Sequence, residues 1–336
     1  MTPRVLSAIQ PTSASFHIGN HLGALQNWVT MQQTHECVYG IADLHAITVE
    51  QDPATLRQQT LVSVAQLIAL GIDPKKSIVF VQSHVAQHTQ LMWALSCITG
   101  LGEANRMTQF KDKAAKGGAS SASVGLLTYP ILQAADILLY QANAVPVGED
   151  QRQHLELTRD LAIRFNGRFG NTFTVPDPFI VKGTAKIQDL QDPLAKMSKS
   201  SPPGCINLLD PIKTTEKKIK SAVTDSDSTV AFDVVNKPGV SNLLTILSAY
   251  SGESIDSLVT RFDGKMYGDL KKAVAESVID FVTPIQARVN ELMDDTAELE
   301  NIMRSGAQRA GEIASKTVDD VYDLSLIHIS EPTRPY

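Results

Sequence analysis

The segment Lys196–Ser200 (KMSKS) combines two lysines and two serines around one methionine. Neither core packing nor helix formation requires this composition. Pro193 before it and Pro202 and Pro203 after it cannot continue a helix, so we expect a polar, twice-charged loop. Such a loop suits a polyphosphate, and a solvated surface turn is the simpler alternative. The phosphate hypothesis therefore requires a second group of residues elsewhere in the chain.

A matching group of residues lies at 11–20 (PTSASFHIGN). Gly19 would let the backbone approach a nucleotide base closely, and His17 and Asn20 at a helix start can donate hydrogen bonds to phosphate oxygens. Taken alone, His17 is more simply a loop or capping residue. The chain contains neither G-x-G-x-x-G nor G-x-x-x-x-G-K-[ST], which argues against a dinucleotide fold and a P-loop.

A third residue suited to chemistry is Asp136, which lies inside the apolar segment 126–142, expected to be a helix. A buried carboxylate requires a partner. That partner is either a ligand or, in the structural alternative, a backbone donor.

The elements that must position these residues alternate between strand and helix. Apolar runs at 5–9, 37–42 and 77–82 predict strands, and the segments after Gly19 and at 53–70 predict helices. This alternation is typical of an α/β fold with a parallel, Rossmann-like sheet. Ligands of such sheets bind beyond the carboxyl ends of the strands, so the loop after the first strand is the expected nucleotide site.

The second half of the chain predicts a helical bundle. Its expected helices are 214–223, 240–250, 254–261, 270–292 and 297–323, and Pro284 should kink or break the fourth. Two sets of lysines are either RNA-binding faces or solvated helix sides: Lys213, Lys217, Lys218 and Lys220, and Lys111, Lys113 and Lys116.

Composition limits the remaining possibilities. The 336 residues suffice for two domains, and 43% hydrophobic content with a net charge of −6 predicts a globular protein rather than a basic nucleic-acid coat. Cys37, Cys97 and Cys205 are odd in number and widely separated, which favours a reducing cytoplasm over a disulfide framework or a metal site. We expect no signal peptide and no membrane span.

Three central segments make a family resemblance specific: 107–111 (MTQFK), 127–140 (LTYPILQAADILLY) and 146–154 (PVGEDQRQH). With the two segments above, they closely resemble the tryptophanyl-tRNA synthetases of class I, from about Leu6 to about Tyr322. The resemblance implies a Rossmann-like catalytic domain at 1–204, with a helical insertion at 105–145, and an all-helical tRNA-binding domain at 205–324.

The same resemblance implies the residues of the site. The residues implied to be catalytic are His17, Asn20, Lys196 and Lys199. ATP contacts fall on Gln10, Pro11, Thr12, Gly19, Asn20, Gly148, Glu149, Asp150, Ile187, Lys196, Met197, Ser198, Lys199 and Ser200. Tryptophan contacts fall on Asp136, Tyr129, Gln109, Gln151, Val147 and Leu6.

Asp136 then has a ligand to recognise, because indole has one donor and no acceptor, and a fixed carboxylate would orient it. The sequence departs from many relatives at Gln133, where they have Met, and at Leu6, where some have Phe.

The implied activity is ATP-dependent formation of tryptophanyl-adenylate, followed by transfer to tRNA(Trp). ATP would be a substrate, Mg²⁺ would assist, and the enzyme would be a cytoplasmic homodimer that binds neither membrane nor DNA. Tyrosyl-tRNA synthetase or a small nucleotidyltransferase is the nearest rival, and Asp136 in its Ala-Ala-Asp context argues against it. A catalytically idle paralogue that senses tryptophan or RNA is a rival of another class, and the two intact motifs argue against that.

The last twelve residues, 325–336 (SLIHISEPTRPY), disagree with the rest of the chain. They neither continue the amphipathic pattern of the preceding helix nor supply a capping glycine. The segment looks like a translated adapter sequence joined to a truncated gene, so we expect it to be foreign to the natural protein and without function. An ordinary disordered terminus is the alternative.

Overall fold

The computed structural model describes residues 2–107, 123–146, 151–179 and 186–325. Several residues singled out above lie outside these ranges, and their predicted roles remain predictions: Gln109, Lys111, Lys113, Lys116, Val147, Gly148, Glu149, Asp150 and the terminal segment from 326 onward.

Five strands of the described residues form one parallel sheet in the order β3-β2-β1-β4-β5. They are β1 (Arg4–Ile9), β2 (Glu36–Ile41), β3 (Ile78–Val81), β4 (Ala144–Pro146) and β5 (Asp177–Phe179). The predicted strands and the predicted α/β fold class are confirmed. The chain runs outward from β1 to β3 and then returns to place β4 beside β1, so the topological switch point lies between β1 and β4.

Alternate residues of the strands face two separate hydrophobic layers, as the period of two requires. Val5, Tyr39 and Val79 belong to one layer, which includes α2 and α4. Leu6 and Phe80 belong to the other, which includes α5, α8 and α9. The helices of this half are α1 (Ile18–Asn20), η1 (His21–Leu25), α2 (Gln26–Met31), α3 (Asp43–Ala46), α4 (Pro53–Ala69), η2 (Gln82–His84), α5 (Gln87–Ser96), α6 (Leu101–Asn105), α8 (Val124–Leu139) and α9 (Arg152–Phe169).

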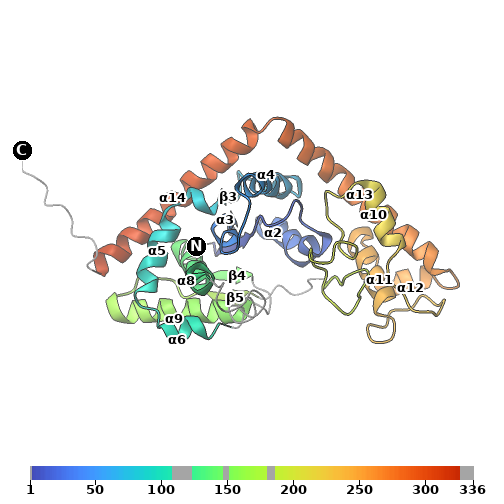
Figure 1. Ribbon diagram of the computed structural model, residues 1–336, viewed down its shortest axis with the longest axis horizontal. Helices are drawn as coiled ribbons and strands as arrows, with labels where there is room; N and C mark the ends of the chain where they lie inside the picture. The colour runs from blue at the N-terminus through green and yellow to red at the C-terminus, as the bar shows by residue number, and fades with distance from the viewer. Residues whose placement is uncertain (1, 108–122, 147–150, 180–185, 326–336) are drawn as a thin grey trace, which may run out of the picture.

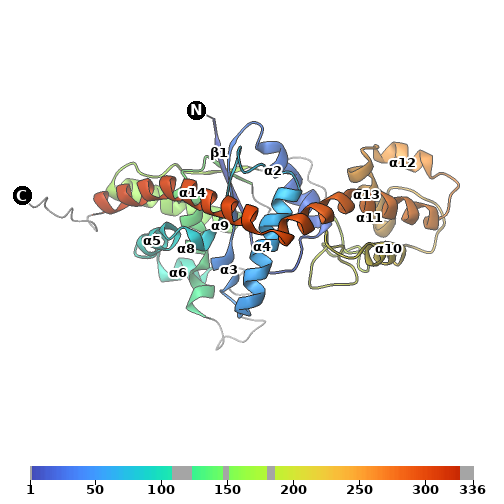
Figure 2. The same ribbon diagram turned by 90° about the horizontal axis from the view of Figure 1, so that it is seen from above.

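The second half is helical, as predicted. It comprises α10 (Ile212–Lys220), α11 (Pro238–Ser251), α12 (Ile255–Arg261), α13 (Tyr267–Asp294) and α14 (Ala297–Leu324). In Figure 1, α13 and α14 form an arch over α4, and Figure 2 shows α14 lying along the first half of the chain.

Helix α14 packs directly on the sheet rather than on the bundle. A Cβ on Gly306 would lie 1.7 Å from the carbonyl oxygen of Val79, so only glycine permits this approach. Ala310, Ala314 and Val321 belong to the same hydrophobic layer as Leu6. The predicted division at 204/205 remains a prediction, and α14 is physically part of the sheet layers.

Helix α13 continues through Pro284, so of the two outcomes expected there, a kink or a break, the break is wrong. Proline removes one hydrogen-bond donor, but Pro284 is exposed, so water can reach the carbonyl group that is left unpaired. In the same turn, Thr283 Oγ1 donates to the carbonyl of Ile279 at 2.7 Å. In the part of the chain that the structure describes, no helix has the length and apolar character needed to cross a membrane.

Helix α14 ends at Leu324, with Ser325 as its cap. We expect removal of residues 325–336 to leave the catalytic rate within about twofold and the thermal midpoint nearly unchanged, because the last few residues of a domain usually contribute little to stability. Activity assays and thermal unfolding of the shortened chain measure both. A large loss of either would show that the segment packs or acts, and recovery of these residues from the source locus would refute their foreign origin.

Candidate active site

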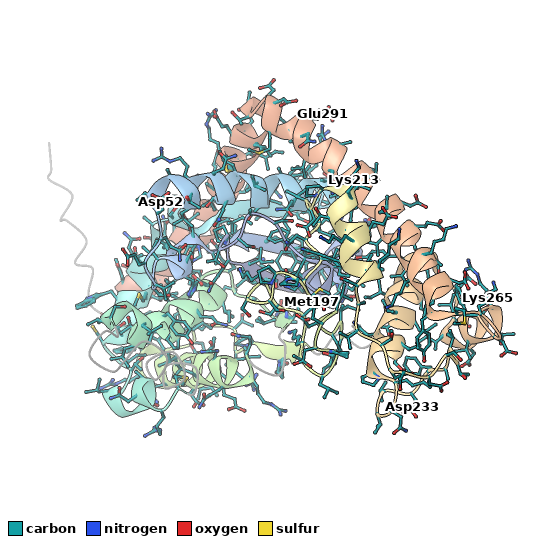
Figure 3. All side chains as sticks on the ribbon, turned by 45° about the vertical axis from the view of Figure 1, so that its right-hand side comes forward. Asp52, Met197, Lys213, Asp233, Lys265 and Glu291 are labelled. Atoms are coloured by element: carbon teal, nitrogen blue, oxygen red, sulfur yellow. The ribbon has the colours of Figure 1, made fainter. Side chains whose placement is uncertain are left out.

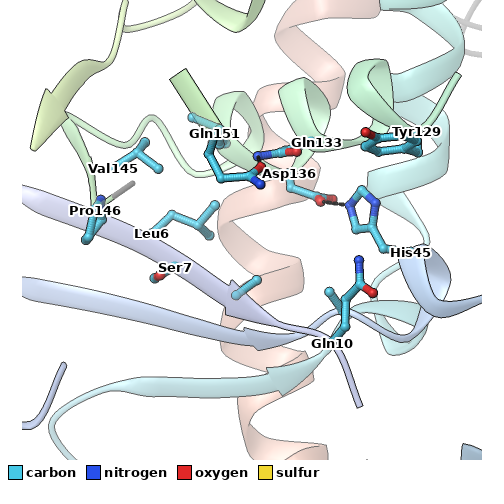
Figure 4. A pocket seen from close by; sticks show the side chains of 13 residues that line it. Leu6, Ser7, Gln10, His45, Tyr129, Gln133, Asp136, Val145, Pro146 and Gln151 are labelled. Atoms are coloured by element: carbon cyan, nitrogen blue, oxygen red, sulfur yellow. Dashed lines mark hydrogen bonds and ion pairs between the residues drawn. The ribbon is translucent and has the colours of Figure 1, made fainter. Parts of the chain in front are cut away.

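A cavity of about 310 Å³ opens at the switch point between β1 and β4, a size typical of small-molecule sites (Figure 4). The residues around it are Leu6, Ser7, Ala8, Gln10, Ala42, His45, Tyr129, Gln133, Asp136, Ile137, Val145, Pro146 and Gln151. The list includes five residues predicted from the sequence: Leu6, Gln10, Tyr129, Asp136 and Gln151.

The carboxylate of Asp136 lies at this cavity with three hydrogen-bond partners. Oδ1 accepts from His88 Nδ1 at 2.6 Å and from Gln82 Nε2 at 2.7 Å. Oδ2 accepts from His45 Nε2 at 2.7 Å, the hydrogen bond drawn in Figure 4. Burial by itself raises the pKa of Asp136, but the charges and hydrogen bonds of His45 and His88 outweigh it and hold the pKa well below its usual range. His88 Nε2 also lies 2.8 Å from Tyr140 Oη.

These three partners of Asp136 were not predicted from the sequence. His45 lies in α3 just after β2, Gln82 follows β3 directly, and His88 is the second residue of α5. Their common signal is position, because polar residues after neighbouring parallel strands meet at one sheet edge. The predicted structural alternative, a backbone donor for Asp136, is not what the structure shows, since all three donors are side chains.

Three other polar residues of the cavity, Tyr129, Gln133 and Gln151, have side-chain partners. Tyr129 Oη lies 3.0 Å from His154 Nε2, and burial raises the pKa of Tyr129 to about 12, so its hydroxyl stays protonated. Gln133 Nε2 donates to Gln151 Oε1 at 3.3 Å. The departure at Gln133 therefore places an amide, instead of a thioether, beside Gln151.

The segment 11–20, predicted to meet phosphates and named here the first phosphate segment, contains α1 at its end. His17 Nδ1 accepts from the backbone N–H of Asn20 at 3.2 Å, and Asn20 Oδ1 accepts from the backbone N–H of His17 at 3.1 Å. This reciprocal cap fixes both side chains. Burial, aided by the charges of Lys199 and Lys196, lowers the pKa of His17 to about 4. The neutral ring accepts through Nδ1, so its proton resides on Nε2.

The second predicted phosphate segment, Lys196–Ser200, packs against the first. Met197 is buried, and its Cβ would be 3.5 Å from a Cβ on Gly19, so Gly19 allows the two segments to touch. Lys199 Nζ donates to Thr12 Oγ1 at 2.6 Å. The backbone N–H of Met197 donates to the carbonyl of Ile187 at 3.0 Å. Figure 3 shows Met197 between the sheet and the helices of the second half.

The residues after the second segment pair with the first. The N–H of Ile18 donates to the carbonyl of Ile206 at 3.0 Å, and the N–H of Leu208 donates to the carbonyl of Phe16 at 2.8 Å. Backbone hydrogen bonds thus join the first predicted phosphate segment to residues 206–208, and the hydrogen bond from Lys199 to Thr12 joins it to the second.

Comparison with known proteins places this site in a family. Residues 1–283 match the family model for tRNA synthetases of class I (W and Y). Tryptophan–tRNA ligase 2 of Streptomyces avermitilis is 60% identical over 323 residues, 96% of each chain. The chain belongs to the tryptophan–tRNA ligases of class I. The resemblance stated from the sequence is confirmed.

Solved structures agree with this assignment. Tryptophanyl-tRNA synthetase of Mycoplasma pneumoniae superposes with a TM-score of 0.87 at 38% identity, covering 98% of this chain and 99% of that one. The Campylobacter jejuni enzyme, complexed with ADP and tryptophan, superposes with a TM-score of 0.84 at 37% identity, covering 95% and 98%.

The predicted basic face on α10 is smaller than the sequence suggests. Lys218 Nζ bonds to Asp210 Oδ2 and to the carbonyl of Cys205, both at 2.7 Å, so this lysine supports the segment after the second phosphate loop. Lys220 pairs with Glu216 on the same helix. Lys213 and Lys217 remain exposed.

A histidine at the junction of the two halves should make stability depend on pH. His21 is buried against Tyr250 and Phe281, and burial lowers its pKa from 6.5 to about 4. The unfolded chain therefore binds an extra proton between these values, so the free energy of unfolding should fall as pH decreases from 6.5 to about 4.

The variant His21→Phe should show a smaller fall in this range, measured by urea unfolding, because phenylalanine cannot take up the proton. The matched variant Tyr250→Phe removes only the hydroxyl at 3.2 Å from His21 Nδ1 and should keep the fall. If the free energy of unfolding fell equally with pH in His21→Phe and in the unsubstituted chain, His21 would not be a cause of the fall.

Proposed function

We propose that this chain is the ligase that joins L-tryptophan to tRNA(Trp), with a role for each residue of the site. The enzyme activates tryptophan with ATP to tryptophanyl-adenylate, releases pyrophosphate, and passes the acyl group to the 3′ end of the tRNA. The observation that carries the proposal is a buried carboxylate at a cavity lined by Gln10, next to the segment whose Thr12 accepts a hydrogen bond from Lys199.

Asp136 is proposed to read the indole N–H. A carboxylate offers about four acceptor positions, and among the described residues His45 is the one hydrogen-bond donor to Oδ2 of Asp136. A rigid acceptor of this kind binds a ring that has a donor more tightly. Beside a ring without a donor, the acceptor is left without a hydrogen bond. Leu6 and Val147 are proposed as apolar walls, and Tyr129, Gln109 and Gln151 as partners of the ammonium and carboxylate groups.

The adenylation step needs positive charge and donors near the α-phosphate. Attack by the tryptophan carboxylate forms a bond to the α-phosphorus as the bond to the pyrophosphate oxygen breaks. Lys196, Lys199, His17 Nε2 and the amide group of Asn20 are proposed to stabilise the negative charge that develops. No covalent enzyme intermediate is required.

The remaining residues are proposed to hold ATP. Gly19 and Ile187 would face adenine, and carboxylates of the 148–150 segment would accept hydrogen bonds from ribose hydroxyls. The phosphates would meet residues of the two loops, which are Gln10, Pro11, Thr12, Met197, Ser198 and Ser200 with the catalytic lysines. Gly148, Glu149 and Asp150 complete the proposed set.

Mg²⁺ is proposed as part of the substrate, MgATP. Among the described residues, no group of three His, Cys, Asp or Glu side chains could hold a metal ion, so these residues do not form a protein metal site. Phosphate oxygens and water are the usual ligands of Mg²⁺ in nucleotide-binding enzymes.

The partners beyond the small substrates are also proposals. The 205–324 helices would bind the tRNA, with exposed Lys213 and Lys217 available for phosphates. A cytoplasmic homodimer without DNA is proposed, and the exposed Trp93 and Leu101 of α5 and α6 (each 69% exposed) suit a subunit contact.

Aminoacylation of purified tRNA tests the proposed function. With ATP and labelled tryptophan, the enzyme should charge tRNA(Trp) and leave tRNA(Tyr) uncharged. Charging of tRNA(Tyr) with tyrosine would support the tyrosyl rival. Tryptophan binding without charging of either tRNA would support the idle paralogue.

A further inference from the structure

A fully buried glutamine on α4 holds the backbone that leads into the first phosphate segment. Gln66 is 0% exposed, and its Oε1 accepts from the backbone N–H of Phe16 at 2.9 Å. The same oxygen lies 3.0 Å from Ser15 Oγ. Its Nε2 donates to the carbonyl of Val62 at 3.2 Å, which anchors the amide within its own helix. Gln66 does not line the cavity.

Ser15 extends this connection to the segment after the second phosphate loop. The buried Ser15 Oγ accepts from the backbone N–H of Leu209 at 3.1 Å. Its hydroxyl proton has two acceptors in reach, Gln66 Oε1 at 3.0 Å and the carbonyl of Phe16 at 2.8 Å. One hydroxyl and one amide therefore join three parts of the chain that are far apart in sequence.

We propose that Ser15 and Gln66, together the Ser15–Gln66 clamp, are positioning residues for adenylation. This inference rests on the proposed function. The clamp sets the backbone at Phe16, one residue before His17, and at Leu209, one residue after Leu208. It thereby fixes the register in which residues 206–208 pair with residues 16–18 at the start of α1.

The reaction is sensitive to this register because its donors come from both segments. His17 and Asn20 are held by α1, whereas Lys196 and Lys199 arrive on the other segment. Misplacement of reacting groups by about 1 Å can cost about a hundredfold in rate. The tryptophan cavity depends on other elements, namely β1, β4 and α8, so a loosened clamp should spare tryptophan binding.

The chain offers a matched control in Gln32, at the end of α2. Its Oε1 accepts from the backbone N–H of Asp73 at 2.9 Å and lies 3.4 Å from Ser77 Oγ, and its Nε2 donates to the carbonyl of Gly71 at 2.7 Å. The hydrogen-bond pattern is the same as that of Gln66. These bonds hold the turn before β3, at the amino ends of the strands and away from the site.

The test compares Gln66→Met, Gln66→Glu, Ser15→Ala and Gln32→Met in tryptophan-dependent pyrophosphate exchange, with thermal unfolding of each. We expect Gln66→Met and Ser15→Ala to lower kcat by about tenfold to a hundredfold, with the KM for tryptophan within about twofold. Gln66→Glu keeps the acceptor oxygen and should recover most of the rate. Gln32→Met should lose stability but keep kcat.

Three results would overturn the inference: a kcat within about twofold for Gln66→Met and Ser15→Ala, an equal loss for Gln32→Met, or a Gln66→Glu enzyme as slow as Gln66→Met. If Gln66→Met does not fold, Ser15→Ala decides by the same criterion. An unsubstituted enzyme without tryptophan-dependent exchange would instead refute the proposed function.

Discussion

Replacing Lys199 with alanine should lower the rate of tryptophan adenylation by about a hundredfold or more while tryptophan binds nearly as before. Its ammonium group lies 2.6 Å from Thr12 Oγ1, so the second phosphate loop already reaches the first. A charge directed at the phosphates acts mainly in the transition state, where negative charge develops. Removing it therefore affects the chemical step more than the binding of the amino acid.

Single-turnover kinetics with saturating ATP and tryptophan measure this rate. Lys213→Ala is the matched control, because Lys213 is an exposed lysine on α10, outside the two phosphate segments. Its adenylation rate should be unchanged. A change of less than about threefold for Lys199→Ala would remove the lysine loop from the mechanism.

Replacing Asp136 with asparagine should reduce selectivity for tryptophan over tyrosine and phenylalanine by about tenfold to a hundredfold. A hydrogen bond to a charged acceptor contributes about 1.5 to 3 kcal/mol, and asparagine removes the charge. Competing exchange reactions give the ratios of kcat/KM. Unchanged ratios would show that Asp136 is a structural residue.

Asp136→Ala should in addition destabilise the fold by about 3 kcal/mol or more, because the buried donors of His45, His88 and Gln82 would lose their acceptor. The variant Tyr140→Phe separates the effect on stability from the effect on selectivity. It removes the hydroxyl at 2.8 Å from His88 Nε2 without touching the cavity. This variant should lower stability and leave selectivity unchanged.

Local sequence predicted those parts of the fold in which pattern and structure coincide. The apolar runs at 5–9, 37–42 and 77–82 became β1, β2 and β3 because central parallel strands are buried on both faces. The five bundle helices also followed from their apolar periodicity. The break expected at Pro284 does not occur, because the cost of a proline depends on exposure of the helix face, which tertiary packing decides.

The proximity of the two motif segments was predictable, and the roles of their residues stay predictions. His17, Gly19 and Lys199 belong to compact segments that touch in the structure. The partners of Asp136 were not predictable in this way, because His45, Gln82 and His88 come from separate loops and converge only through the sheet order. Lys218 likewise reads as a free cation in the sequence and proves to be paired with Asp210.

The central claim is that this site activates tryptophan in preference to other aromatic amino acids. Exchange of labelled pyrophosphate into ATP, with tryptophan, tyrosine and phenylalanine tested side by side on one enzyme preparation, measures it most directly. We predict rapid exchange with tryptophan and exchange with tyrosine and phenylalanine that is slower by at least about a hundredfold. The proposed reason is that Asp136 accepts the indole N–H, which phenylalanine lacks and whose position the tyrosine hydroxyl does not occupy. Equal exchange with tyrosine, or none with tryptophan, would contradict the account.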